Sequence, residues 1–168
     1  MPFRSLVHRV FMDPAFEKNL DFMSRIPFFE GLHKHDLGKL LGILYAKTYQ
    51  ADEVVFPEGE TGRALYLIES GEVVIMKSAP TSPGHAEEKM IARLGPGGFF
   101  GEMALLEELP RSATVKTTKG SVLHLVYKVK LDSFVEKHPR IGVKILRNLA
   151  KVLSSRLRET SDSYVRHL

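Results

Sequence analysis

A carboxylate and a guanidinium lie nine residues apart in the segment FFGEMALLEELPRSATV, which spans residues 99–115. They belong to Glu102 and Arg111, and both have apolar neighbours of the kind that proteins bury. A buried charge is costly unless it finds a partner. Either the two side chains satisfy each other, or a ligand satisfies both.

The residue types around this pair favour a phosphate ligand. The guanidinium fork of Arg111 matches two phosphate oxygens, Ser112 can donate a further hydrogen bond, and the small Ala113 leaves room for a close approach. Gly101 lets the backbone come near a ligand. A carboxylate beside a phosphate site can accept a hydrogen bond from a sugar hydroxyl, which is the role we expect for Glu102. Phosphate together with ribose implies a nucleotide.

The same segment predicts a turn and one short helix. Gly97 and Gly98 allow a tight turn, and the run EMALLEE consists of helix formers that end at Pro110. The first N–H groups of such a helix, around Ala104 and Leu105, are expected to be unpaired and to face the anion.

The segment FGEMALLEELPRSATV closely resembles the phosphate-binding cassette of the cyclic nucleotide-binding domain family. The motifs IPFFEGL and VVFPEGETGRALYLIESGEVVI resemble the family in the same order, and the resemblance covers about residues 26–160. It implies that Glu102 binds ribose and Arg111 binds the cyclic phosphate. Pro110 and Thr114 also match the cassette, and the ligand-binding residues expected from it are Gly101, Glu102, Met103, Ala104, Arg111, Ser112 and Ala113.

In layout the chain is similar to bacterial catabolite activator-type proteins. Their barrel is followed by a long dimer helix, and RLRETSDS resembles a segment of that helix. The resemblance implies that Thr160 and Ser161 hydrogen-bond the purine, with cAMP preferred to cGMP; alternatively, both merely lie near a helix end. Those activators continue with a helix-turn-helix domain, whereas this sequence stops at Leu168, so we expect no direct DNA binding and an effector that is either a separate protein or a segment missing from a truncated chain.

Three regions surround and include the cassette. Residues 1–46 carry apolar positions at helical spacing, from Phe11 to Leu44, and predict an N-terminal helical region. Residues 47–128 consist of short β-rich runs between Gly/Pro turns, which predict an all-β barrel or jelly roll, with KSAPTSPGHAEE as an exposed hairpin tip. Residues 129–168 predict a short helix that stops before Pro139 and then a long one. We expect one α+β domain.

The long helix is expected to act as a hinge or lid and to form a homodimer through residues 139–165. Its broad apolar stripe includes a 3–4 spacing that suits a second copy of the helix, at Leu146, Leu149, Leu153, Arg156 and Thr160. The net charge of the chain is +4, whereas residues 137–168 alone carry about +6. This excess fits a solvated helix face or, alternatively, an acidic partner surface.

Composition excludes several other classes. With no cysteine among 168 residues, the chain has no disulfide, thiolate metal site or cysteine nucleophile. No signal peptide or membrane span is evident, so we expect a cytoplasmic protein. His33 and His35 precede the barrel and are not expected to bind metal, and His124 on an apolar strand is expected to be a satisfied core histidine.

Two functions from different classes follow from these observations. The first is a receptor that binds cAMP, or alternatively cGMP, and transmits binding through movement of its C-terminal helix. The second is a ligand-independent dimerisation or scaffold module on the same fold, in which Glu102 and Arg111 form a satisfied ion pair. An enzyme is not expected, because the cassette offers no general base aimed at phosphorus, and no cofactor is implied.

Overall fold

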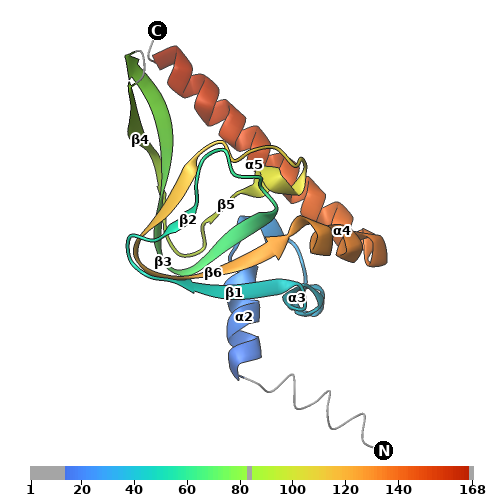
Figure 1. The fold of residues 1–168 in the computed structure, drawn as a ribbon. Coiled ribbons are helices and arrows are strands. Elements are labelled where there is room, and N and C mark those ends of the chain that lie inside the picture. The colour runs from blue at the N-terminus through green and yellow to red at the C-terminus, as the bar shows by residue number, and fades with distance from the viewer. Residues whose placement is uncertain (1–13, 83–84, 167–168) are drawn as a thin grey trace, which may run out of the picture. The chain divides into compact units, whose positions relative to one another are not determined.

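The β-rich runs of the sequence fold into one antiparallel sheet. The computed structural model describes residues 14–82 and 85–166. Within them the strands are paired in the order β1-β6-β3-β4, with β2 also on β6 and β5 also on β3 (Figure 1). Their bounds are β1 (Leu44–Tyr49), β2 (Val54–Phe56), β3 (Ala64–Ser82), β4 (His85–Leu94), β5 (Phe99–Phe100) and β6 (Thr114–Tyr127).

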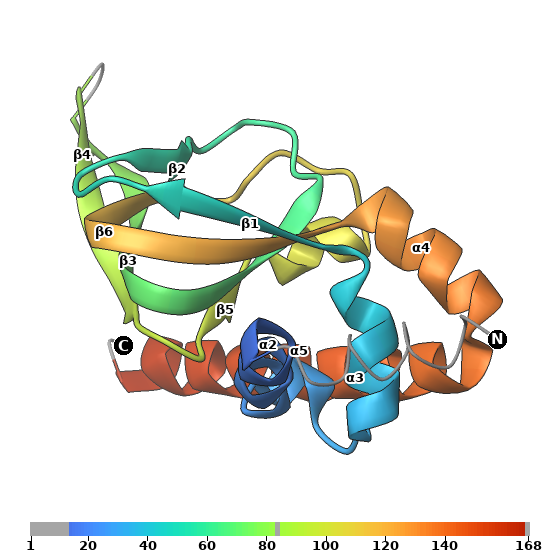
Figure 2. The same ribbon diagram turned by 90° about the horizontal axis from the view of Figure 1, so that it is seen from below.

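The sheet closes into a barrel around an apolar and aromatic core. Strands β1, β6 and β3 lie side by side and curve together (Figure 2). Since side chains alternate between the faces of a strand, the core takes every second residue over part of β3 (Ala64, Tyr66, Ile68) and of β6 (Leu123, Leu125), and register shifts change this alternation before Val73. The buried core so formed includes Tyr66, Ile68, Val73, Phe100, Val115, Leu123 and Leu125. The predicted β-barrel fold is confirmed.

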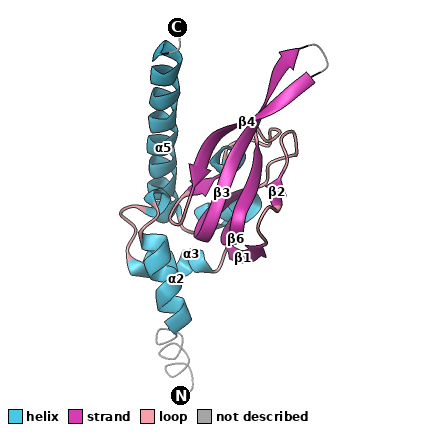
Figure 3. Ribbon diagram, turned by 90° about the vertical axis from the view of Figure 1, so that its left-hand side faces the viewer, coloured by secondary structure: helices cyan, strands magenta, loops and turns pink. Residues whose placement is uncertain are grey.

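Strand pairing changes two details of the sequence prediction. Leu44 begins β1, although we placed it in the helical region, because residues 44–49 pair with residues 121–126 of β6. Strand β6 also runs unbroken through Gly120, where a turn was expected between two shorter runs. The predicted hairpin is present: β3 and β4 pair as far as Ser82 and His85 and extend beyond the other strands (Figure 3). Residues 83–84 lie outside the described part of the chain.

The chain forms two compact units. The barrel belongs to residues 43–132, and residues 1–42 and 133–168 make up a helical unit. The described helices are α2 (Pro14–Ser24), η1 (Pro27–Phe29), α3 (Lys34–Leu41), α4 (Lys128–Lys137), which bridges the two sequence ranges, and α5 (Pro139–Arg166). Phe11 of the predicted helical region lies outside the described residues. No helix in the described parts of the chain combines the length and the hydropathy needed to cross a membrane.

Helix α5 is attached to η1 by polar contacts. The buried side-chain amide of Asn148 donates to the backbone carbonyls of Phe28 (3.2 Å) and Glu30 (2.8 Å). Lys144 Nζ donates to the carbonyl of Gly31 (3.1 Å). Buried carbonyls need partners, and Asn148 supplies two of these bonds beside the apolar residues of α5.

Candidate functional site

The cassette is the connection that leaves the barrel at β5 and returns to it at β6 (Figure 1). It contains a single turn of 3₁₀ helix, η2 (Glu102–Leu105), preceded by Gly101 in a left-handed conformation with φ +77°. Glu102 is 4% exposed and Ala104 is also buried, whereas Met103 is 48% exposed. The carboxylate identified from the sequence is therefore inside the protein.

Two details of the predicted helix are wrong. It ends at Leu105 rather than at Pro110, because the following residues turn back to pair with another loop: Gly62 N–H donates to Leu109 O (3.3 Å), and Thr61 bridges to Pro110. The N–H of Ala104 is not unpaired, since it donates to Gly101 O (3.2 Å). Of the two features expected to attract an anion, the structure therefore weakens the helix end and leaves Arg111.

The loop of residues 57–63 holds the backbone of Arg111. Arg111 N–H donates to Glu60 O (2.7 Å), and Gly59 N–H donates to Arg111 O (2.9 Å). In the sequence this loop belongs to a motif that resembles the family, and none of its residues is among the predicted site residues. Its signal was the glycine-containing run PEGETGR, which directly precedes a buried strand.

The guanidinium of Arg111 lies against an aromatic surface. Its Cζ is 4.0 Å from the centroid of the Phe56 ring and 5.7 Å from that of Tyr66. These are cation–π distances. Tyr66 in turn stacks on Phe100, with ring centroids 5.1 Å apart and planes inclined by 4°. Arg111 Nη2 also donates to Ala64 O (3.1 Å), so the side chain is held in place by the barrel.

Arg111 is a buried cation, and one of its hydrogen-bond donors has no partner. The residue is 8% exposed, and burial lowers the pKa of its guanidinium from the ordinary value, while Tyr66, Glu60 and Glu102 oppose this shift. Arg111 Nε has no hydrogen-bond partner, which is true of no other buried side-chain nitrogen or oxygen in residues 14–82 and 85–166. An unsatisfied buried donor costs roughly 1–3 kcal/mol. The protein neighbours of Arg111 therefore do not fully satisfy it.

Two glycines make room for the guanidinium. A Cβ at Gly62 would lie 3.3 Å from both Cζ and Nε of Arg111. A Cβ at Gly101 would lie 2.8 Å from Arg111 Nη1 and 3.0 Å from Ala64 O. Arg111 can occupy this place only because neither backbone segment carries a side chain.

The remaining predicted site residues divide between the two units. Ser112 is exposed and Ala113 buried, and both directly follow Arg111. Thr160 and Ser161 lie on α5 and are exposed; their hydroxyls donate to the carbonyls of Arg156 (2.8 Å) and Leu157 (2.9 Å) one turn earlier. The barrel unit thus supplies the cassette residues together, and the α5 residues belong to the helical unit.

The described histidines are not arranged as a metal site. His124 is buried on β6 with Nε2 2.8 Å from Glu69 Oε2, which confirms the prediction of a satisfied core histidine. Within the described ranges, no group of three or more His, Asp or Glu side chains is arranged to hold a metal ion.

Comparisons with known proteins place these residues in a wider context. A family model described as cyclic nucleotide-binding domain matches residues 46–138, a range that contains the whole cassette. The chain is 33% identical over 137 residues to the cyclic AMP receptor protein of Thermus thermophilus, covering 82% of this chain and 60% of that protein. It is 35% identical over 118 residues to a cAMP-dependent protein kinase regulatory subunit of Eremothecium gossypii, covering 68% of this chain and 24% of that protein.

Solved structures that are similar to the chain point to the same family. The Thermus thermophilus catabolite activator protein aligns with a TM-score of 0.73 and 30% identity over 82% of this chain and 61% of that one. A cyclic nucleotide-binding domain from Methylobacillus flagellatus aligns with a TM-score of 0.77 and 26% identity, over 92% of this chain and 84% of that one. The chain spans less than two thirds of the length of both sequence relatives and of the Thermus structure.

Proposed function

The chain belongs to the cyclic nucleotide-binding domain family, and from this we propose that it is a cyclic nucleotide receptor that transmits binding through its C-terminal helix. The observation that carries the proposal is the buried guanidinium of Arg111 with its unpartnered Nε. A cyclic phosphate brings one negative charge and the acceptor oxygens that this donor lacks. The role is that of a binding module rather than an enzyme.

Each cassette residue receives a role under this proposal. Arg111 binds the phosphate charge, with Ser112 and Ala113 beside it, and Gly101 and Ala104 allow the close approach. Glu102 accepts a hydrogen bond from a ribose hydroxyl. The exposed Met103 contacts the ligand's apolar surface. The alternative, a scaffold that binds no ligand, requires the protein itself to satisfy Arg111, which the unpartnered Nε argues against.

We assign the preference for cAMP over cGMP to Thr160 and Ser161. Both hydroxyls already donate to their own helix, so their lone pairs remain available to accept a hydrogen bond. The amino group of adenine is a donor and suits them, whereas the guanine carbonyl needs a donor and would require an intrahelical bond to break. Two relatives carry cAMP in their names, which favours the same ligand.

A homodimer through residues 139–165 is part of the proposal. The predicted seam needs revision, because Leu149 is buried within the chain. The apolar residues that α5 exposes along one side are Val143, Leu146, Leu157 and Val165. Leu157 is 68% exposed, and a second copy of the helix would cover such side chains. The movement of α5 on ligand binding would then be transmitted to a separate effector protein.

Thermal melting with and without nucleotide tests the function. We expect cAMP to raise the melting temperature more than cGMP at equal concentration. Ligand at 100 times its dissociation constant adds about 2.7 kcal/mol of stability. No shift in melting temperature with either nucleotide would support the scaffold.

Light scattering tests the homodimer separately. We expect a mass twice the 18.9 kDa of the chain, and a monomer at tens of micromolar would reject the dimer.

The Thr160→Ala/Ser161→Ala variant tests base recognition. We expect weaker cAMP binding and a smaller ratio between cAMP and cGMP affinities, because the acceptors for the adenine amino group are gone. Calorimetric titration with each nucleotide measures both quantities. Ser154→Ala removes an exposed hydroxyl from the same helix and should leave both affinities unchanged. If the variant keeps the wild-type ratio of cAMP to cGMP affinity, Thr160 and Ser161 do not recognise the base, and nucleotide recognition is limited to the cassette.

A further inference from the structure

A lysine on β3, which is not among the predicted site residues, forms a hydrogen bond with the cassette. Lys77 Nζ donates to the backbone carbonyl of Ser112 (2.6 Å) and to Glu58 Oε1 (2.6 Å). The other carboxylate oxygen of Glu58 accepts from Ser78 N–H (3.1 Å), and Glu58 N–H donates to Thr114 Oγ1 (3.0 Å). We call Glu58, Lys77 and Ser112 the Lys77 bracket. Their hydrogen bonds connect β3, the loop of residues 57–63 and the end of the cassette.

The bracket lies where regular strand pairing ends. Strand β3 pairs with β6 as far as Met76 and Thr114, and Lys77 is the next residue of β3. The backbone just before Thr114 therefore lies beyond the last residue pair of this ladder. Lys77 supplies a side-chain donor to the carbonyl of Ser112 at this point. The orientation of the Ser112–Ala113 peptide group is thus set by a lysine rather than by a strand.

That orientation matters because the peptide group is planar and trans. Its C=O and N–H point to opposite sides, so fixing the carbonyl of Ser112 also fixes the N–H of Ala113. Since the carbonyl points at Lys77, the Ala113 N–H points away from it. Ala113 follows the phosphate-binding Arg111 by two residues, and backbone N–H groups are effective donors to phosphate.

We propose that Lys77 is a positioning residue for the cyclic phosphate: it holds the carbonyl of Ser112 so that the Ala113 N–H is aimed at the anion bound by Arg111. This inference rests on the proposed function. Two of the three ammonium donors of Lys77 are engaged by Glu58 and Ser112, and the proposal gives Lys77 no direct bond to the phosphate. The hydrogen bond from Lys77 lowers the pKa of the Glu58 carboxyl from its ordinary value.

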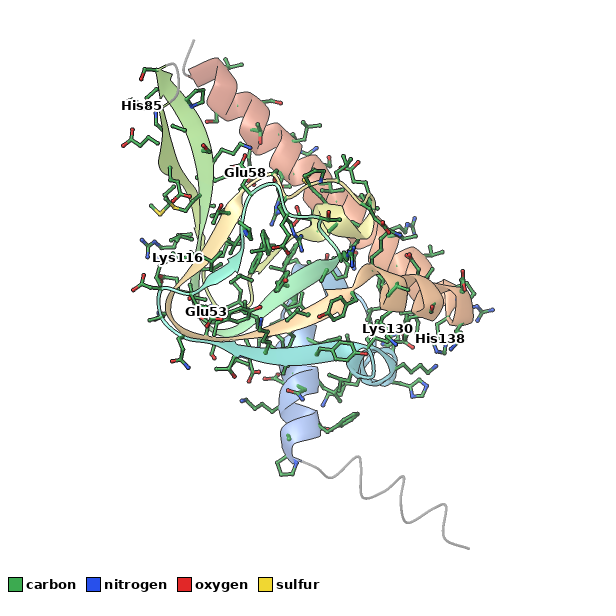
Figure 4. The ribbon with its side chains drawn as sticks, in the orientation of Figure 1. Glu53, Glu58, His85, Lys116, Lys130 and His138 are labelled. Atoms are coloured by element: carbon green, nitrogen blue, oxygen red, sulfur yellow. The ribbon has the colours of Figure 1, made fainter. Side chains whose placement is uncertain are left out.

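Three variants separate this role from the loss of a charge. Lys77→Met removes both hydrogen bonds, and Lys77→Arg can restore them. Lys116→Met is the matched control: it removes the same charge from a half-buried lysine whose partner is Asp52 (3.3 Å) and which lies apart from Glu58 (Figure 4). Exposed ion pairs add little to folding stability, so all three variants should melt close to the wild type without ligand.

Calorimetric titration with cAMP measures the outcome. We expect Lys77→Met to weaken binding by about tenfold, Lys77→Arg to recover most of this, and Lys116→Met to bind like the wild type. Unchanged affinity in Lys77→Met, or an equal loss in Lys116→Met, would overturn the proposal.

A measurement without ligand keeps the two proposals separable. In nuclear magnetic resonance spectra of the ligand-free protein, the amide resonances of Ala113 and Ser78 should move in Lys77→Met and stay in place in Lys116→Met. If the wild type binds no nucleotide, the proposed function fails, whereas an Ala113 resonance that does not move in Lys77→Met rejects the bracket by itself.

Discussion

Arg111→Leu will lose cyclic nucleotide affinity while keeping the stability of the ligand-free protein. Without the guanidinium fork, the phosphate meets only neutral donors, which should cost on the order of 2–4 kcal/mol of binding, or roughly 30- to 1000-fold. The ligand-free protein, in contrast, no longer buries a cation with an unpartnered Nε. Leucine can pack against Phe56 and Tyr66, so the melting temperature should stay level or rise.

Calorimetric titration and ligand-free melting give these two quantities separately. Arg111→Lys is the informative companion, because it keeps the charge but not the fork, and we expect an affinity between those of the wild type and Arg111→Leu. Arg93→Leu is the control, since Arg93 forms an exposed ion pair with Glu72. Undiminished affinity in Arg111→Leu would show that the phosphate binds elsewhere. A large drop in its melting temperature would mean that Arg111 supports the fold.

Gly101→Ala should damage both the fold and the site. At φ +77° an alanine is strained, and its Cβ would lie 2.8 Å from Arg111 Nη1 and 3.0 Å from Ala64 O. The strain should cost about 1–3 kcal/mol of stability. Because the carbonyl of Ala64 belongs to β3 and cannot easily move, Arg111 must shift, and we expect the affinity for cAMP to fall by at least tenfold.

Gly97→Ala separates strain from displacement of Arg111. Gly97 has a similar φ of +82°, but a Cβ there would meet no atom within 4 Å. This variant should lose stability by melting yet retain cAMP affinity by titration. Equal losses of affinity in the two variants would mean that backbone strain, and not the contact with Arg111, controls binding.

The sequence by itself determined the features that lie within one continuous segment. Glu102 and Arg111 come together because both belong to residues 99–115, so their order and spacing suffice to predict one site. The barrel was equally readable, because short β-rich runs between Gly/Pro turns are typical of an all-β barrel. Pro139 marked the start of α5, since proline suits the first position of a helix.

Only the tertiary structure decided which distant residues complete the site. Phe56, Ala64 and Lys77 lie far from Arg111 in sequence, and their contacts depend on the register between β3 and β6 and on the pairing of residues 57–63 with the cassette. The same pairing ends η2 at Leu105 despite the helix formers that follow it. Likewise, Leu149 fits a dimer seam by spacing but is buried within the chain. The local sequence pattern shows which secondary structure each segment prefers. Burial and contact partners, in contrast, are set by strand pairing and by packing between segments, and no single segment encodes them.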